Sequence, residues 1–286
     1  MVKEIMKQEY NIANRNGLSM NVVTDIVKKP KGTAIIHHGY VGNMSSPTIQ
    51  LMRRTFNDLG FTTITPNTTH NYNDSDGDYQ KMTLRGHCED LVDCVLNTLD
   101  SKNYTGPLVL AGHSAGGYSA IVASSELEGK YKPALTIASA PLISGERYMQ
   151  GWKEVIKAQN ISPDKFIKHW ENKGFIECGS DSGPDTLELH WSVMMDWCQH
   201  DLIKDEITPN NPTVLIGGEI DPFIRQQDVI DYFEMSRIKE VSFIEDADHC
   251  YTGQEKAFEE HLRETINSYF PKPGFLHQTH KPQALS

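Results

Sequence analysis

Residues 107–129 read PLVLAGHSAGGYSAIVASSELEG, and the fold can be worked out from this stretch. It opens with a short, continuous apolar run, which is typical of a central parallel strand buried on both faces, and continues into a helical segment. Between them lies a G-x-S-x-G sequence centred on Ser114. A larger side chain at Gly112 or Gly116 would collide with a sharp strand-to-helix turn. Such a turn lifts the serine hydroxyl above the sheet edge and aims the helix N-terminus at it, so we predict that Ser114 is a nucleophile.

The same alternation of strand and helix extends along the rest of the chain. Short apolar runs precede segments of helical character, which favours an α/β fold with a mostly parallel, eight-stranded sheet and helices on both faces. The predicted strands are Gln8–Asn14, Ser19–Ile26, Thr33–His38, Phe61–Pro66, Pro107–Gly112, Ala134–Ser139, Thr213–Gly217 and Val241–Glu245. The predicted helices lie near residues 44–58, 83–100, 115–128, 224–236 and 253–269.

One stretch, from Leu142 to Glu206, shows helical patterns and no strand pattern. It leaves the sheet after one predicted strand and returns before the next. Ligands bind at the carboxyl edge of open α/β sheets, so a helical insert at this point would overhang Ser114. We therefore predict an inserted cap over residues 142–206. The core would comprise residues 1–141 and 207–270, followed by a loose tail over residues 271–286.

All four tryptophans of the chain lie in this insert. Two stripes of apolar residues recur in it at helical spacing. If the stripes face the cap's underside, they form an apolar pocket wall; the alternative is that they pack only against the main core. The residues assigned to the pocket are Trp152, Trp191, Met194 and Met195.

Composition excludes several classes of function. The 286 residues carry a net charge of −11, which makes a nucleic-acid backbone or an anionic membrane surface an unfavourable partner. No apolar run approaches the ~18 residues of a spanning helix, and the N-terminal MVKEIMKQEY lacks the apolar region of a secretory signal. Five scattered cysteines without a C-x-x-C pair indicate free thiols. We expect a cytoplasmic protein without a cofactor or membrane insertion, and leave a homodimer open.

A serine hydroxyl needs a general base, and the base needs an acid that orients it. His249 lies in the loop after the last predicted strand, where the base belongs in this architecture. Asp221 follows the preceding strand and is the predicted acid. Other carboxylates lie too near the strand end, on the base's own loop, or in the next helix; these rivals are Glu219, Asp246, Asp248 and Asp228.

An oxyanion that develops during acyl transfer needs two backbone donors. We predict the N–H of Ala115, directly after the nucleophile, and the N–H of Tyr40, in the H-G-x sequence that begins at His38. The Tyr40 side chain either borders the acyl pocket or covers its loop. His37 and His38 could instead suggest a metal pair, but neighbouring strand residues point to opposite faces, so no metal site is predicted.

These motifs together resemble those of α/β-hydrolase carboxylesterases, in particular bacterial feruloyl and cinnamoyl esterases and their monoacylglycerol-lipase-like relatives. The chain order Ser…Asp…His agrees with that family. The resemblance runs through about residues 17–269, and it departs at NTTHNY (67–72) and in a longer, Trp-rich insert. It implies an α/β-hydrolase fold and an insert that closes over the acyl site. The pieces that carry it are HHGYVGN (37–43), NDSDGDYQKMT (73–83), GHSAGG (112–117), GGEIDP (217–222) and EDADHCYTG (245–253).

The expected activity is hydrolysis of small to medium acyl or aryl carboxylic esters through an acyl-enzyme. Residues 177–206 include eight acidic residues and one lysine, which should repel polyanionic substrates such as acyl-CoA thioesters. The same triad also serves peptidases, thioesterases and acyltransferases. A non-catalytic protein that uses the pocket to bind a small molecule is the alternative from another class.

Overall fold

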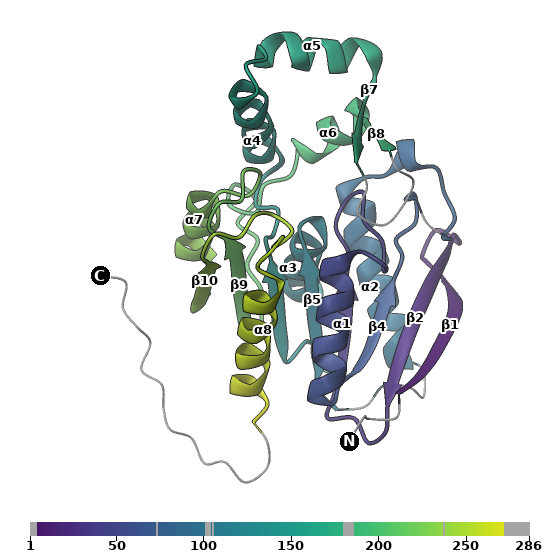
Figure 1. Cartoon of the computed structure of the whole chain (residues 1–286). Coiled ribbons are helices and arrows are strands. Elements are labelled where there is room, and N and C mark those ends of the chain that lie inside the picture. Colours follow the sequence, from purple (N-terminus) through teal and green to yellow (C-terminus); the bar gives the residue numbers. More distant parts are fainter. Residues whose placement is uncertain are drawn as a thin grey trace.

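The computed structural model describes residues 5–72, 74–100, 104, 106–179, 186–236 and 238–271. An eight-stranded sheet forms its centre, in the order β1-β2-β4-β3-β5-β6-β9-β10 (Figure 1). β2 is antiparallel to both of its neighbours, and the other strands are parallel. All eight predicted sheet strands are confirmed. Their bounds are β1 Ile5–Ala13, β2 Ser19–Val27, β3 Thr33–His37, β4 Thr62–Pro66, β5 Leu108–His113, β6 Leu135–Ser139, β9 Thr213–Gly218 and β10 Glu240–Ile244.

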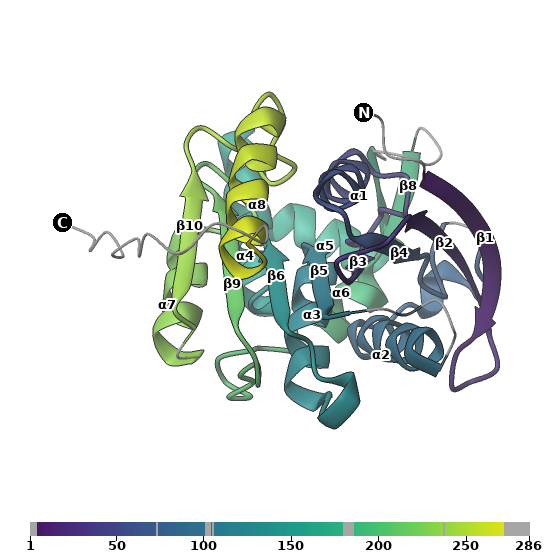
Figure 2. The same cartoon turned by 90° about the horizontal axis from the view of Figure 1, so that it is seen from below.

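Helices cover both faces of the sheet, as Figure 2 shows. Ile36 of β3 packs in one apolar cluster with residues of α1 and α8, whereas Ile35 packs in another with residues of α2 and α3. Both faces of the central strands are therefore buried, which explains their continuous apolar sequences. The helices are α1 Pro47–Leu59 and α8 Glu255–Tyr269 on one face, and α2 Leu84–Asp100, α3 Ala115–Glu126 and α7 Gln226–Ser236 on the other, with short 3₁₀ turns η1 Tyr79–Lys81 and η2 Gly129–Tyr131.

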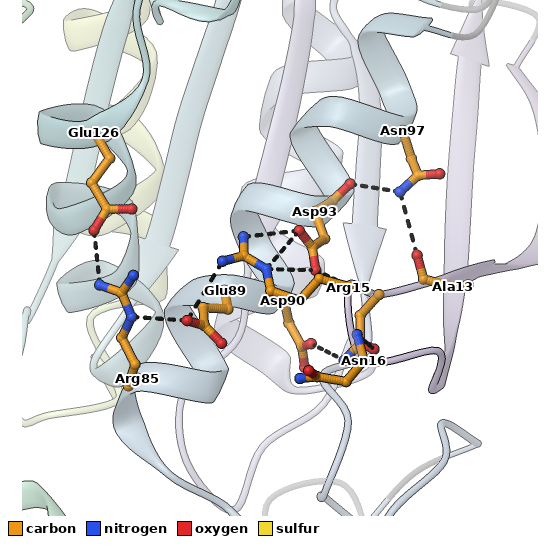
Figure 3. A network of polar contacts seen from close by, with 10 residues as sticks. Ala13, Arg15, Asn16, Arg85, Glu89, Asp90, Asp93, Asn97 and Glu126 are labelled. Carbon is orange, nitrogen blue, oxygen red and sulfur yellow. Dashed lines mark hydrogen bonds and ion pairs between the residues drawn. The ribbon is translucent and has the colours of Figure 1, made fainter.

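A polar network fastens the β1–β2 turn to α2 (Figure 3). The Arg15 guanidinium lies 2.9 Å from Asp93 and 3.5 Å from Glu89. The Asn14 side-chain amide donates to the buried carboxylate of Asp90 at 2.9 Å. Asp90 also accepts a hydrogen bond from the Thr69 N–H, so this network joins the antiparallel end of the sheet to the loop after β4.

The insert between β6 and β9 stands above the carboxyl ends of the strands (Figure 1). Hydrogen bonds from Leu202 N–H to the Ile143 carbonyl and from Gly145 N–H to the His200 carbonyl close its neck. The segment contains helices, as predicted. Its elements are α4 Gly145–Ala158, α5 Pro163–Lys173, β7 Phe175–Gly179, β8 Thr186–His190 and α6 Trp191–Trp197.

The prediction that this segment contains no strand was wrong, because β7 and β8 pair as an antiparallel hairpin. Leu187 and Leu189 are buried while Glu188 between them is half-exposed, which is the period of a strand. β8 continues without a loop into α6. One of the two apolar stripes that were assigned to helices therefore spans the junction between a strand and a helix.

Two expectations concern the remainder of the chain. None of the helices in the described ranges is both long enough and apolar enough to cross a bilayer. The predicted loose tail lies, after Pro271, outside the described residues.

Candidate active site

Ser114 occupies the sharp turn between β5 and α3. Its backbone has φ 58° and ψ −119°, a region that non-glycine residues rarely adopt. A Cβ at Gly112 would lie 2.1 Å from the Gly116 carbonyl oxygen, and one at Gly116 would lie 2.2 Å from that of His37. Both glycines are therefore required for the turn that presents the Ser114 hydroxyl.

Replacing Gly116 by alanine should destabilise the fold by about 3 kcal/mol or more, because the added methyl group meets rigid backbone rather than a movable side chain. Urea denaturation measures the change. Gly129→Ala is the control: Gly129, unlike Gly116, has positive φ, but its Cβ would meet nothing within 4 Å, so about 1 kcal/mol is expected. Equal losses in the two variants would show that the turn is not sterically constrained.

Ser114, His249 and Asp221 form one hydrogen-bonded chain. His249 Nε2 lies 3.0 Å from Ser114 Oγ, and His249 Nδ1 lies 2.7 Å from Asp221 Oδ2. The three residues follow β5, β10 and β9, so parallel strands bring them to one edge of the sheet. The arrangement favours the tautomer in which Nδ1–H donates to Asp221 and Nε2 accepts from the Ser114 hydroxyl.

Asp221 is held in its charged form. Burial acts to raise its pKa, but the charge and hydrogen bond of His249, together with the N–H groups of Ile224 and Phe223, outweigh burial and lower the pKa. The two amides donate to Oδ1 at 2.9 and 2.8 Å. An ionised carboxylate in this position can stabilise an imidazolium that forms on His249.

The rival carboxylates have other partners. Glu219 accepts a hydrogen bond from the Asp246 amide, and Asp248 accepts from two amides of its own loop. Asp228 forms ion pairs with two arginines. The structure thus brings Asp221, rather than these residues, to the imidazole.

His113 supports the loop that carries His249. Its Nε2–H donates to the His249 carbonyl at 2.8 Å, and the two ring centroids are 4.9 Å apart. Burial, and next the proximity of His249, lower the pKa of His113 to about 4, so it stays neutral near pH 7. Sequence reasoning missed this role, although His113 immediately precedes the serine.

The loop after β3 passes directly over Ser114. A Cβ at Gly39 would lie 3.0 Å from Ser114 Cβ. His38 Nδ1–H donates to the Gly39 carbonyl at 2.8 Å, while His38 Nε2 accepts from Thr68 N–H at 3.1 Å. Because C=O and N–H point in opposite directions across a trans peptide, this bond fixes the direction of the Tyr40 N–H.

Two amides beside Ser114 can serve as donors. Ala115 is the first residue of α3, so its N–H has no acceptor within the helix. The backbone hydrogen bonds found among the described residues include none from Ala115 or Tyr40. These are the two amides predicted from the sequence as oxyanion donors.

The adjacent histidines His37 and His38 are both buried, and their rings stack with centroids 5.6 Å apart. Burial lowers the pKa of His37 to about 3 and that of His38 to about 4. His37 Nε2 lies 3.1 Å from the His87 carbonyl. Within the described ranges, no group of three His, Cys, Asp or Glu side chains is arranged to hold a metal ion.

A cavity of about 230 Å³ opens at Ser114 and His249. The core and the insert both contribute to its walls. A larger hollow, about 470 Å³, lies between β1, β2 and α2, and it shares no lining residue with this cavity. The side chains that line the cavity, besides Ser114, His249 and His113, are Tyr40, Val41, Ser46, Thr48, Ile49, Tyr148, Trp152, Cys178, Leu189, Phe223 and Cys250.

No protein-family model matches the chain, and no curated protein matches it significantly. Solved structures do match. Est1E from Butyrivibrio proteoclasticus, in a structure with ferulic acid bound, superposes with a TM-score of 0.69 at 17% identity, over 92% of this chain and 100% of that one. The Pyrococcus furiosus esterase Pf2001 gives a TM-score of 0.71 at 15% identity, covering 93% and 91%.

Mouse alpha/beta hydrolase domain-containing protein 10 is 20% identical, with a TM-score of 0.68 over 92% of this chain and 98% of that one. The strand order and these superpositions indicate the same fold. The chain has the α/β-hydrolase fold. In the α/β-hydrolase fold a nucleophile elbow follows a central strand, and the acid precedes the base along the chain, as do Asp221 and His249 here.

Within this α/β-hydrolase fold, the predicted pocket wall needs correction. Trp152 lines the cavity, but Trp191, Met194 and Met195 do not. Trp191 packs against Trp170 at a centroid distance of 5.6 Å, Met194 is 2% exposed in the core cluster, and Met195 packs on the edge of that cluster. The reason is that α6 packs against the core elements α2 and η1 as well as α4 and β8, so its apolar side chains fill the cap–core interface.

Two aromatic residues that line the cavity, Tyr148 and Phe223, were not predicted. Tyr148 lies one turn before Trp152 on α4, so the helical spacing of the two was the available signal. Phe223 follows Asp221 by two residues, and only the path of that loop brings it to the cavity. The Tyr40 side chain both borders the cavity and stacks on Tyr79, with centroids 5.4 Å apart, so the two roles left open for it coincide.

Proposed function

We propose that the protein is a carboxylic-ester hydrolase that works through an acyl-enzyme intermediate, with Ser114, His249 and Asp221 as its catalytic residues. The observation that carries the proposal is the hydrogen-bonded chain from Asp221 through His249 to Ser114, which ends at the cavity. Among the structurally similar proteins, Pf2001 is described as an esterase and Est1E has a structure with ferulic acid bound. Both descriptions support an ester hydrolase.

In the first half of the reaction, Ser114 Oγ attacks the ester carbonyl carbon and its proton passes to His249 Nε2. The carbonyl oxygen becomes an oxyanion that accepts hydrogen bonds from the N–H groups of Tyr40 and Ala115. Collapse of this intermediate breaks the bond to the alkoxy oxygen, which leaves as the alcohol with the proton from His249. The acyl group is then esterified to Ser114.

In the second half, a water molecule attacks the acyl carbon and gives its proton to His249. Collapse of the second oxyanion releases the carboxylic acid, and the proton returns from His249 to Ser114 Oγ. Asp221 stays ionised throughout and stabilises the imidazolium, in keeping with its lowered pKa.

The size and lining of the cavity support small to medium neutral esters. A cavity of roughly 150 Å³ holds one benzene ring, so 230 Å³ accommodates a ring with a substituent or a short acyl chain. None of the described residues that line it is a lysine or an arginine that would pair with an anionic substrate. Exclusion of acyl-CoA by the acidic insert stays a prediction. So do the cytoplasmic location and the bounds of the cap, and a homodimer stays open.

Assays on a panel of p-nitrophenyl esters, anilides and thioesters test the proposal. Faster turnover of esters than of anilides or thioesters is expected. Preferred cleavage of anilides or thioesters would assign the triad to a peptidase or thioesterase, and binding without turnover would assign the cavity to a small-molecule receptor.

The rate should depend on pH through the base. Only neutral His249 can accept the serine proton, so kcat/KM should rise as the pH increases through the titration of His249 and then level off. A pH–rate profile for p-nitrophenyl acetate between about pH 5 and pH 8 measures this. A flat profile over that interval would contradict His249 as the base.

A further inference from the structure

The indole N–H of Trp152 is a buried donor in the cavity wall. Its Nε1 atom is shielded from solvent, and none of the described residues completes a hydrogen bond with it. Its polar neighbour is the hydroxyl of Tyr148, one helical turn earlier. Burial raises the pKa of Tyr148, and the nearby Trp152 N–H partly offsets that rise. Buried polar groups without a partner are uncommon in folded proteins, so this one calls for an explanation.

Phe223 connects this pair of side chains to the catalytic residues. Its ring packs against those of Trp152 and Tyr148, with centroids 5.2 and 5.7 Å away, and its N–H donates to Asp221. All three aromatic residues line the same cavity as Ser114. The unpartnered donor is therefore part of the chamber in which an ester would bind.

The donor is also held in place. A Cβ at Gly151 would lie 2.7 Å from the Pro222 carbonyl oxygen, so α4 rests directly on the loop that follows Asp221. On the same helix, Arg147 pairs with the buried carboxylate of Asp228 on α7 at 2.9 Å. A donor fixed in this way offers a hydrogen bond without a large loss of side-chain freedom.

The surroundings favour a neutral acceptor. The described lining residues include no lysine or arginine that would neutralise an anion, and the nearby Asp221 carboxylate contributes to the raised pKa of Tyr148. A negatively charged group next to Tyr148 would thus be repelled by Asp221. The matching ligand group is an uncharged oxygen.

We propose that Trp152 and Tyr148 recognise a neutral, hydrogen-bond-accepting oxygen (an ether, hydroxyl or carbonyl) that the ester carries away from its scissile bond. The inference rests on the proposed ester hydrolysis and specifies the substrates of that same site: oxygen-substituted acyl or aryl esters. Trp152 acts by binding and takes no part in the bond-breaking steps.

Matched pairs of p-nitrophenyl benzoates test this proposal, with methoxy or methyl at the same ring position (ortho, meta or para). The quantity measured is the ratio of kcat/KM for the methoxy ester to that for the methyl ester. In Trp152→Phe, which keeps an aromatic ring and removes the N–H, this ratio should fall about fivefold for at least one ring position. Trp191→Phe is the control, because Trp191 lies outside the cavity and its variant should leave the ratio as in the wild type. If Trp152→Phe folds poorly, the same ratio is measured in Tyr148→Phe, where it should also fall.

An unchanged ratio at every ring position in both Trp152→Phe and Tyr148→Phe would overturn the inference, even if the wild type hydrolyses all of the esters. Binding to Ser114→Ala, measured by calorimetry with the methyl methoxybenzoates and the matching methyl methylbenzoates at each ring position, separates recognition from turnover. A wild type that cleaves no ester would refute the proposed function. Recognition would still be supported by tighter binding of a methoxy compound that is lost on adding Trp152→Phe, and refuted by equal binding within the pair at every ring position.

Discussion

Turnover of p-nitrophenyl acetate by Ser114→Ala is expected to be at least about 10⁴-fold lower than that of the wild type, with the fold unchanged. The side-chain oxygen is the attacking atom, and its hydrogen bond in the structure is to His249, so its loss removes chemistry and little packing. Steady-state kinetics measures the effect, and circular dichroism checks the fold.

Ser125→Ala is the matched control for this variant. Ser125 lies on the same helix, and its hydroxyl donates to the Val122 carbonyl rather than to the site. It should therefore retain wild-type turnover. Covalent labelling by an organophosphonate should occur at Ser114; labelling at a different serine would refute the assignment of the nucleophile.

Asp221→Asn should reduce turnover by about 10⁴-fold. The amide of asparagine can donate to His249 Nδ1, which places the imidazole proton on Nε2, where it can no longer accept the serine proton. Asp248→Asn is the control, since its side chain accepts hydrogen bonds from the amides of Cys250 and Thr252 and an asparagine oxygen can still accept them. Near-normal activity in Asp221→Asn, together with an inactive Asp248→Asn or Asp246→Asn, would show that the acid lies elsewhere.

The central strands could be predicted because a strand that is buried on both faces has a continuous apolar sequence. Runs such as TAIIH (33–37) and LVLAGH (108–113) are buried at every position. The turn at Ser114 could also be predicted from the sequence, because only glycine fits at positions 112 and 116. These features depend on local sequence and on one general property of parallel sheets.

The pocket wall could not be predicted in the same way. Trp152 and Trp191 have the same chemistry, and both belong to amphipathic segments. Which of them faces Ser114 depends on how α4 and α6 are docked, and this docking depends on contacts far apart in the sequence, such as Gly145 against the carbonyl of Trp197. The hairpin β7–β8 was missed because its two strands are only five residues long and β8 merges with α6.

Hydrogen bonds that support the site were also beyond the reach of the sequence. His38 and His113 each lie within a recognised motif, but nothing local reveals that one holds the Gly39 carbonyl and the other the His249 carbonyl. Both contacts join segments that the sheet brings together. Twelve histidines in the chain made a choice among them by composition alone impossible.

The close packing of Gly151 on Pro222 has a consequence for the evolution and engineering of this protein. Inserts at the edge of a sheet are often regarded as exchangeable modules, whose sequence can diverge freely while the catalytic scaffold is kept. Here helix α4 packs on the residues that immediately follow Asp221, the proposed acid, so a grafted insert with any larger side chain at that point would displace the loop that orients Asp221. Changes of substrate range in this lineage should therefore arise by single replacements on α4 that preserve Gly151, and wholesale exchange of the insert should impair turnover of every substrate.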